Sequence, residues 1–302
     1  MLALSGSVEP RHRFVVRSMI AAIALGLSAC GGSGPSTTAQ SSDNAPAGNA
    51  VPNGDGTAGN GTGNGTDNGT GTGSNASDAV KDAVARLTDV GTKRFTYIVS
   101  VADGDDANDG LSVEKPFKTL ERALRIVGPG DTIELRAGVY MPKTTFAAGE
   151  ERENGFYLRA AGTAGAKIKL KPYNNEKAIV DAGDRDFAFY VFARAAYWII
   201  EGLEIRGGGS QGYTVKIDAH HVNLVNNNIH GSKLDIIKLV QTSDDVVIFG
   251  NEIHHPDALA GANSQGIDIV GADRVWIAHN YVHDIHSIAM YAKGNARDAI
   301  FE

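Results

Sequence analysis

An internal repeat in the second half of the chain restricts its possible folds more than any other feature. One pattern of alternating apolar residues followed by a turn occurs at Trp198–Ile205, Val222–His230, Val246–His254 and Val275–His283. The starts of these units lie 24, 24 and 29 residues apart, and a further unit begins 24 residues later at Ala299. Short strands with this period are typical of stacked coils, in which each coil buries its apolar face only against its neighbours. The repeat therefore predicts an all-β solenoid with about 24 residues per coil, and not a sandwich.

Three asparagines fall at the same turn of successive coils: Asn227, Asn251 and Asn280. Coils of such a solenoid stack at about 4.8 Å, so these amides can hydrogen bond along the column. We expect this column to be structural. The five extra residues in the longer spacing lie around 256–264, where we expect a loop of the kind that often lines a binding groove.

Each coil also has a second strand before the repeated unit, predicted at 213–218, 235–240, 266–270 and 288–293. Side chains alternate across a strand, so pointing the apolar residues inward aligns the residues between them on the outer face. This places one outer column at Lys216, Lys238, Asp268 and Tyr291, and a second column that ends at Lys293. Basic and acidic groups a few ångströms apart on a flat sheet suit a sugar chain that carries carboxylates.

The region before the coils predicts two helices and two strands. Apolar residues at helical spacing predict a helix over 78–90, with Asp78 as N-cap and Gly91 as its stop. A second helix is expected from Pro116 to about Val127. Alternating residues predict strands at 95–100 and 132–136.

The same region carries residues that resemble a known family. They are Asp103–Gly110, Pro116–Leu120, Ala123–Leu124, Pro129–Ile133 and Ala137–Tyr140. Together they are similar to the opening segment of β-helix polysaccharide-active proteins in the pectate-lyase-like superfamily, which includes a group of calcium-dependent pectate lyases. The resemblance covers about forty residues and implies a right-handed parallel β-helix with a helical N-terminal cap.

The resemblance also implies a chemistry, β-elimination on uronates. This reaction needs a cation to neutralise the substrate carboxylate and a base to take the adjacent C5 proton. By resemblance, Asp235 and Asp268 fall near calcium-binding aspartates, and Lys293 resembles a lysine on the catalytic strand. The chain departs from the family at Ser264 and Gln265, where that group has two aspartates, and calcium takes six to eight oxygen ligands. Lys293 also comes about one coil early.

A lysine can act as a base only if its pKa is lowered by a neighbouring cation or by loss of solvent. We predict that Lys216 and Lys238 lower each other's pKa and that Asp268 opposes this, with Lys293 as the third catalytic candidate. Solvated surface charge is the alternative for all three lysines. A salt bridge or a structural turn is the alternative to metal binding for Asp268 and Asp235.

Histidines also recur with the coils, at His230, His254 and His283. Stacked imidazoles can hold a metal ion, because neutral histidine is a common ligand. Alternatively, the repeat merely reuses one turn residue. As substrate-binding residues we predict Tyr291, His254 and His283.

The first thirty residues resemble a bacterial lipoprotein export signal. Three arginines precede an apolar run at 19–27, which is too short for a permanent membrane span. Leu27–Cys30 has the form of a lipobox, so we expect acylation at Cys30, the only cysteine; a lone buried thiol is the alternative. Gly31 and not aspartate follows, and by resemblance to enterobacterial lipoprotein sorting this implies anchoring in the outer membrane.

We divide the 302 residues into a signal peptide (1–29), a flexible low-complexity tether (30–77), a helix and N-terminal cap (78–140) and β-helix coils (141–302). The tether is rich in Gly, Ser, Thr and Asn, cannot bury a core, and reaches roughly 35–40 Å. The sequence stops within a predicted strand at Ile300–Glu302, so we expect coils beyond it.

Two functions remain open at this point. The first is a lyase, or less favoured an epimerase or hydrolase, that acts on an acidic polysaccharide with calcium as its cofactor. The second is a non-catalytic protein that binds glycans or forms a rigid rod. The net charge of −7 and the absence of a basic patch exclude nucleic acid as an expected partner. We expect a monomer that touches the membrane only through its lipid.

Overall fold

The computed structural model describes residues 76–145, 153–209, 212–257 and 264–302. The predicted signal peptide, the predicted lipidation site Cys30 and nearly all of the predicted tether lie outside these ranges, as does most of the predicted loop at 256–264. Residues 74–302 form one compact unit. Within the described ranges, no helix has the length and apolar character needed to span a membrane.

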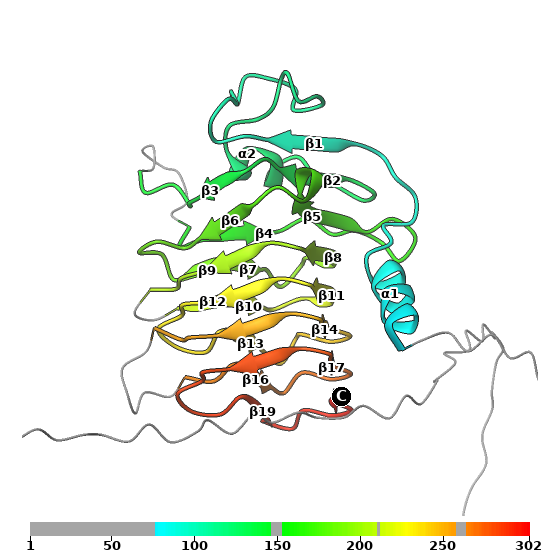
Figure 1. Ribbon diagram of the computed structural model, residues 1–302, viewed down its shortest axis with the longest axis vertical. Coiled ribbons are helices and arrows are strands. Elements are labelled where there is room, and N and C mark those ends of the chain that lie inside the picture. Colours follow the sequence, from blue (N-terminus) through cyan, green and yellow to red (C-terminus); the bar gives the residue numbers. More distant parts are fainter. Residues whose placement is uncertain (1–75, 146–152, 210–211, 258–263) are drawn as a thin grey trace, which may run out of the picture. The chain divides into compact units, whose positions relative to one another are not determined.

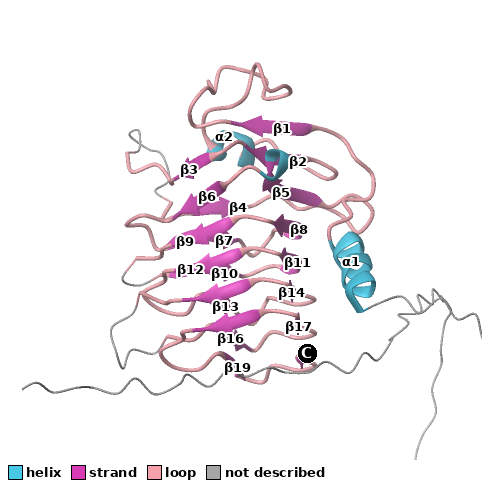
Figure 2. Ribbon diagram, in the orientation of Figure 1, coloured by secondary structure: helices cyan, strands magenta, loops and turns pink. Residues whose placement is uncertain are grey.

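The compact unit is a parallel β-helix whose coils stack as rungs (Figure 1 and Figure 2). The strands form three parallel sheets, which we name sheets I, II and III, and a complete coil passes through one strand of each. Sheet I has eight strands: β1 (Thr96–Val99), β2 (Thr132–Leu135), β5 (Ile168–Pro172), β8 (Ala196–Glu201), β11 (His220–Val225), β14 (Val247–Phe249), β17 (Trp276–Ala278) and β20 (Ile300–Phe301).

The other two sheets have six strands each and complete the coil. Sheet II contains β4 (Phe156–Leu158), β7 (Phe187–Val191), β10 (Tyr213–Ile217), β13 (Ile237–Leu239), β16 (Ile267–Val270) and β19 (Met290–Lys293). Sheet III contains β3 (Gly138–Tyr140), β6 (Ala178–Asp181), β9 (Glu204–Arg206), β12 (Asn228–His230), β15 (Glu252–His254) and β18 (Tyr281–His283). The predicted solenoid is confirmed, but each predicted repeat unit divides into a sheet I strand and a sheet III strand.

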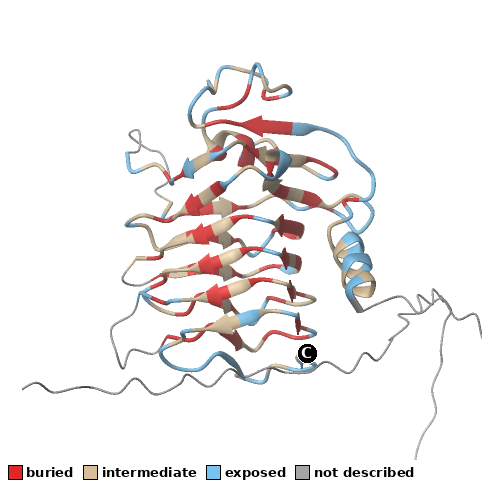
Figure 3. Ribbon diagram, in the orientation of Figure 1, coloured by how far each residue is buried: buried red, intermediate tan, exposed pale blue. Residues whose placement is uncertain are grey.

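The core is a column of β-branched and aliphatic side chains inside the coils (Figure 3). In sheet III, Ile205, Ile229 and Ile253 are register partners on successive coils, and all three are completely buried. Trp198 is also completely buried, and its indole N–H donates to the carbonyl oxygen of Ala160 at 2.7 Å. Each coil therefore covers the core of its neighbours.

The predicted asparagine column forms a continuous hydrogen-bonded ladder. The Asn227 side-chain amide donates to Oδ1 of Asn251 at 3.0 Å. The Asn251 amide donates in turn to Oδ1 of Asn280 at 3.0 Å. These partners are 24 and 29 residues apart in sequence, so the predicted coil spacing is confirmed.

The residue before each ladder position bends the chain from sheet I into sheet III. This turn needs a left-handed backbone, and φ is positive at Asn226, Gly250 and His279; Gly202, at the equivalent turn one coil earlier, also has a positive φ. At Gly250, where φ is 69°, a Cβ atom would lie 2.3 Å from Oδ1 of Asn226, so a larger residue there would have to displace the Asn226 side chain.

The helix α1 (Ala76–Leu87) lies against the flank of sheet I, as Figure 1 shows. Its apolar residues Val80, Val84 and Leu87 pack beside Val225 and Phe249. These two residues face outward from sheet I and would otherwise meet solvent. The helix thus covers an apolar strip along several coils.

The helix α2 (Leu120–Leu124) is shorter than predicted. Asp106 accepts hydrogen bonds from the backbone N–H groups of Lys118 and Thr119, both at 2.9 Å. Thr119 is consequently extended and serves as the N-cap, so the helix cannot begin at Pro116. A one-turn 3₁₀ helix, η1 (Tyr173–Asn175), follows β5.

Candidate functional site

The predicted outer columns lie on the outward face of sheet II. Lys216 pairs with Lys238, Lys238 with Asp268, and Asp268 with Tyr291 in the strand register. Lys293 is the register partner of Val270 in the adjoining column. The period of two along each strand was therefore sufficient to predict the alignment.

Aromatic rings continue the same column on the coils before β10. Tyr190 is the register partner of Lys216, and Tyr157 is that of Tyr190. The Tyr157 and Tyr190 rings are 5.1 Å apart, and Phe187 lies 5.2 Å from Tyr190 and 6.3 Å from Tyr213. The sequence prediction missed this part, although the continuous apolar run Phe187–Val191 is consistent with a strand.

We name the set Tyr157, Phe187, Tyr190, Tyr213, Lys216, Lys238, Asp268, Tyr291 and Lys293 the sheet II strip. One end of the strip is aromatic and the other carries the charged groups. Tyr157 also lines a cavity of about 610 Å³ together with Glu121, Arg125 and Arg159. Burial raises the pKa of Glu121 in that cavity more than its hydrogen bond from the Lys143 N–H lowers it.

Lys216 is held by aromatic rings. Its Nζ lies 4.5 Å from the ring centroid of Tyr190 and 5.7 Å from that of Phe187. An ammonium over such faces is attracted by the ring quadrupole. Within the described part of the chain, Lys216 forms no ion pair with a carboxylate. Its charge is therefore available to an acidic ligand.

Lys238 is bound by two buried aspartates. Its Nζ donates to Oδ2 of Asp235 at 3.1 Å and also to Oδ2 of Asp268. The Asp268 side chain is completely buried, and Lys293 pairs with the same oxygen at 3.0 Å. Asp268 thus lies in the predicted outer column, but its side chain is buried and ion-paired with Lys238 and Lys293 and is not open to solvent.

The prediction of a lowered lysine pKa was wrong for Lys238. Burial alone would lower the pKa of this ammonium, but the hydrogen bond to Asp268 and the charge of Asp235 raise it above its ordinary value. Burial raises the pKa of Asp235, against its hydrogen bonds from Gln265 and Lys238. Lys238 is therefore a protonated counter-ion here and not a general base.

The residues near Asp268 do not fit a calcium ion. Oγ of Ser264 and Oδ1 of Asp268 are among the buried oxygens without a hydrogen-bond partner in the described part of the chain. However, the described residues supply only the carboxylates of Asp235 and Asp268, and the Lys238 ammonium lies between them. Calcium prefers six to eight oxygens, and a divalent ion would meet the charge of two lysines at this position.

Tyr190 also cannot act as a base near neutral pH. Its hydroxyl donates to Oδ2 of Asp218 at 3.0 Å, and Thr242 donates to the other oxygen of that carboxylate. Burial, followed by the hydrogen bond to Asp218, raises the pKa of Tyr190 to about 12. The phenol therefore presents a neutral ring and a fixed hydroxyl.

The predicted site residues do not all come together. Tyr291 belongs to the sheet II strip, where Nζ of Lys293 lies 4.9 Å from its ring centroid. His254 and His283 lie on β15 and β18 of sheet III, which is a different face of the coil. The predicted binding set thus divides between two sheets.

A family model for the Pel9A-like right-handed β-helix region matches residues 97–276, which is more than half of the chain. The chain belongs to this Pel9A-like family. The right-handed parallel β-helix predicted from the resemblance is therefore confirmed.

Relatives of this Pel9A-like protein include named lyases. It is 28% identical to pectate lyase L of Paenibacillus polymyxa (strain SC2) over 113 aligned residues. The alignment covers 34% of this chain and 23% of pectate lyase L. The pectate lyase Pel9A structure matches with a TM-score of 0.52 at 19% identity, over 64% of this chain and 54% of that one. An alginate lyase structure from Paenibacillus sp. str. FPU-7 matches with a TM-score of 0.51 at 19% identity, over 68% and 64%. The chain thus spans less than two thirds of each relative's length.

Proposed function

We propose that this Pel9A-like β-helix binds a uronate-containing polysaccharide along the sheet II strip. The observation that carries the proposal is the row of aromatic rings that leads directly to Lys216, a lysine without a carboxylate partner among the described residues. Relatives named as a pectate lyase and an alginate lyase support an acidic polysaccharide as the ligand class.

The strip matches such a chain in both length and chemistry. Six parallel strands at about 4.8 Å span roughly 24 Å, which accommodates several sugar units. Aromatic rings offer apolar faces to sugar rings, with hydroxyl groups at their edges. A lysine that meets a substrate carboxylate forms a charge-assisted hydrogen bond. Because Lys238 and Lys293 are already paired with Asp268, Lys216 would carry most of this recognition.

As a second function we propose cleavage of the bound polysaccharide by β-elimination, which the lyase relatives favour. A base from outside the sheet II strip, such as a water molecule, would take the C5 proton, the bond from C4 to the glycosidic oxygen would break, and the departing oxygen would take up a proton from water. The product would carry a 4,5-double bond. Lys216 would neutralise the substrate carboxylate. Among the described residues of the strip, Lys238 and Tyr190 both have raised pKa values, so neither supplies the base.

Ultraviolet absorbance of the unsaturated uronate product separates the two functions. The full chain is incubated with polygalacturonate, alginate and chondroitin, each with and without calcium, and binding to the same polymers is measured by affinity electrophoresis. Binding without an absorbance increase supports the binding function alone. Binding with an absorbance increase supports both functions. Failure to bind any of these polymers contradicts the proposal.

We also propose that the protein is an exported lipoprotein, anchored to the outer membrane through Cys30, that acts as a monomer. The lipobox pattern Leu27–Cys30 supports this location, and the long polar segment after it would let the β-helix reach extracellular glycan. Replacement of Cys30 by Ser should release the protein from the membrane fraction. If the variant remains anchored, the lipid attachment is refuted.

A further inference from the structure

The outward face of sheet III carries a second group of chemically active side chains, away from the sheet II strip. Arg206, His230, His254 and His283 are successive register partners there. The rings of His230 and His254 stack at 4.9 Å, and those of His254 and His283 also stack at 4.9 Å. The histidine repeat in the sequence is therefore a true column in space.

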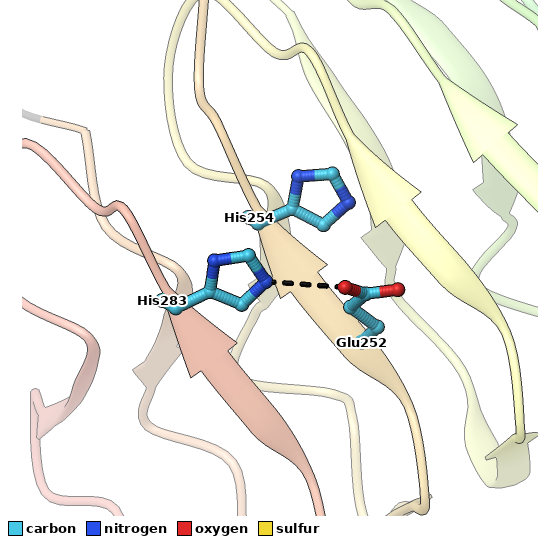
Figure 4. A group of neighbouring side chains, drawn as sticks. All are labelled: Glu252, His254 and His283. Atoms are coloured by element: carbon cyan, nitrogen blue, oxygen red, sulfur yellow. Dashed lines mark hydrogen bonds and ion pairs between the residues drawn. The ribbon is translucent and has the colours of Figure 1, made fainter. Parts of the chain in front are cut away.

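A carboxylate stands beside this column on the middle coil. Glu252 is two residues before His254 on β15, so both side chains face outward. Its Oε1 lies 3.2 Å from Nε2 of His283 on the next coil, and Figure 4 shows the three side chains converging. One donor atom from each of Glu252, His254 and His283 lies within 4.8 Å of the others.

Both histidines have a hydrogen-bond partner for the ring nitrogen on the far side. Nδ1 of His283 is 2.9 Å from Oδ2 of Asp284. Nδ1 of His254 is 2.7 Å from Nδ1 of His255. Metal-binding histidines almost always use the second nitrogen in this way, because the bond fixes the tautomer and orients the ring.

The proton positions around His283 favour a cation between it and Glu252. If Nδ1 of the neutral ring donates to Asp284, Nε2 has no proton and turns its lone pair toward the Glu252 carboxylate. Two acceptors at 3.2 Å repel each other unless a proton or a metal ion lies between them. His283 is thus held between two carboxylates, and its Nε2 converges with Glu252 on a point that a proton or a metal ion can occupy.

His254 can supply the second nitrogen by a change of tautomer. Asn228 donates its amide to Glu252 at 3.0 Å, so its Oδ1 faces Nε2 of His254 at 2.9 Å. Moving the ring proton to Nδ1 keeps a hydrogen bond, now with His255, and frees Nε2. Oδ1 of Asn228 would then lie beside the freed nitrogen as a further oxygen donor.

We propose that Glu252, His254 and His283 bind a divalent transition-metal ion of the zinc type on sheet III. Two imidazoles and one carboxylate are a ligand set that suits Zn²⁺, whereas calcium prefers oxygen alone. Tetrahedral donors lie about 3.4 Å apart, so the side chains would close by up to about 1.5 Å on binding. Water or Asn228 would complete the coordination. This site does not depend on the proposed polysaccharide function, since it lies on another sheet.

Titration of the full chain with Zn²⁺ by isothermal calorimetry tests the site. We expect E252Q and H283A each to lower the Zn²⁺ affinity of one site by at least about 100-fold, since even indirect partners of metal ligands contribute 10- to 100-fold. His279 is exposed and outside the cluster, so H279A is the matched control and should bind like the parent chain. Circular dichroism melts check that each variant is folded, and Co²⁺ spectra report tetrahedral coordination directly.

Three results would overturn the proposal. The first is a parent chain that does not bind Zn²⁺. The second is an E252Q variant that binds like H279A while D284N and H283A lose the ion, since this would place the metal on His255, His283 and Asp284. The third is equal binding by all variants, which would place the metal outside sheet III.

Discussion

Replacing Lys238 by Met removes the ammonium group that pairs with the two buried aspartates and retains most of the apolar part of the side chain. The substitution therefore tests the effect of this charge alone. Asp268 keeps Lys293 at 3.0 Å, but Asp235 loses its ion-pair partner while remaining almost fully buried. Removing one partner of a buried ion pair lowers the free energy of unfolding by about 3–5 kcal/mol. Because Lys293 still pairs with Asp268, we expect K238M to lose about 3 kcal/mol, the lower end of this range. For a domain of this size, that corresponds to a fall in Tm of roughly 6–12 °C.

The same substitution should make stability depend on pH with a definite sign. Burial already raises the pKa of Asp235, and loss of the ammonium raises it further. The folded variant then holds a proton more tightly than the unfolded chain does, so its stability increases as pH falls from neutral toward about 4. The difference in free energy of unfolding between the parent chain and K238M should therefore be smaller at pH 5 than at pH 7.

Urea unfolding at both pH values measures these two effects, with K216M as the matched control. Lys216 contacts aromatic rings and no carboxylate among the described residues, so its loss should cost only about 0.5–1 kcal/mol, with little pH dependence. The reasoning is refuted if K238M is as stable as K216M at pH 7, or if its deficit grows as the pH falls.

Two further predictions concern the frame that holds the site. N251A removes the middle of the asparagine ladder, where the Asn251 side chain donates to Leu224 and Asn280 and accepts from Asn227. Urea unfolding should show that the free energy of unfolding falls by about 3 kcal/mol. A fall of less than about 1 kcal/mol would mean that the ladder is not structural. Burial alone would raise the pKa of Asp131, but hydrogen bonds from the Arg94 guanidinium and from backbone N–H groups hold it below its ordinary value. The ionised Asp131 stabilises the folded state above the pKa that this group has in the unfolded chain, and this stabilisation is lost as the pH falls through its pKa in the folded state. D131N should therefore lower the free energy of unfolding by about 2 kcal/mol at pH 7 and by progressively less below pH about 4. A difference that stays constant down to pH 2 would contradict this.

The sequence alone was sufficient to predict the coils and their register. The 24-residue repeat predicts the solenoid, and alternation within each strand predicts the alignment of Lys216, Lys238, Asp268 and Tyr291 that the strand register shows. Both patterns come from local rules that every coil obeys. In stacked coils the apolar side chains of every strand must point inward, and a shift of one residue would turn them outward. This requirement fixes which residues of neighbouring strands pair.

The electrostatics of the site could not be predicted in this way. A residue that points out of a sheet is not necessarily exposed: Asp268 is buried, and the lysines that pair with it come from the coils before and after it. The aromatic end of the strip belongs to early coils whose sequences do not follow the later repeat. Glu252 was missed beside His283 because the two residues are 31 positions apart and meet only through the strand register.

Calorimetric titration of the full chain with polygalacturonate and alginate oligomers tests the central claim most directly. K216M should bind at least about 10-fold more weakly than the parent chain, because a charge-assisted hydrogen bond contributes about 1.5–3 kcal/mol, and added salt should weaken binding of the parent. Lys81 is an exposed lysine on α1, away from sheet II, so K81M should bind like the parent. If K216M and K81M bind equally well, the sheet II strip is not the polysaccharide-binding face.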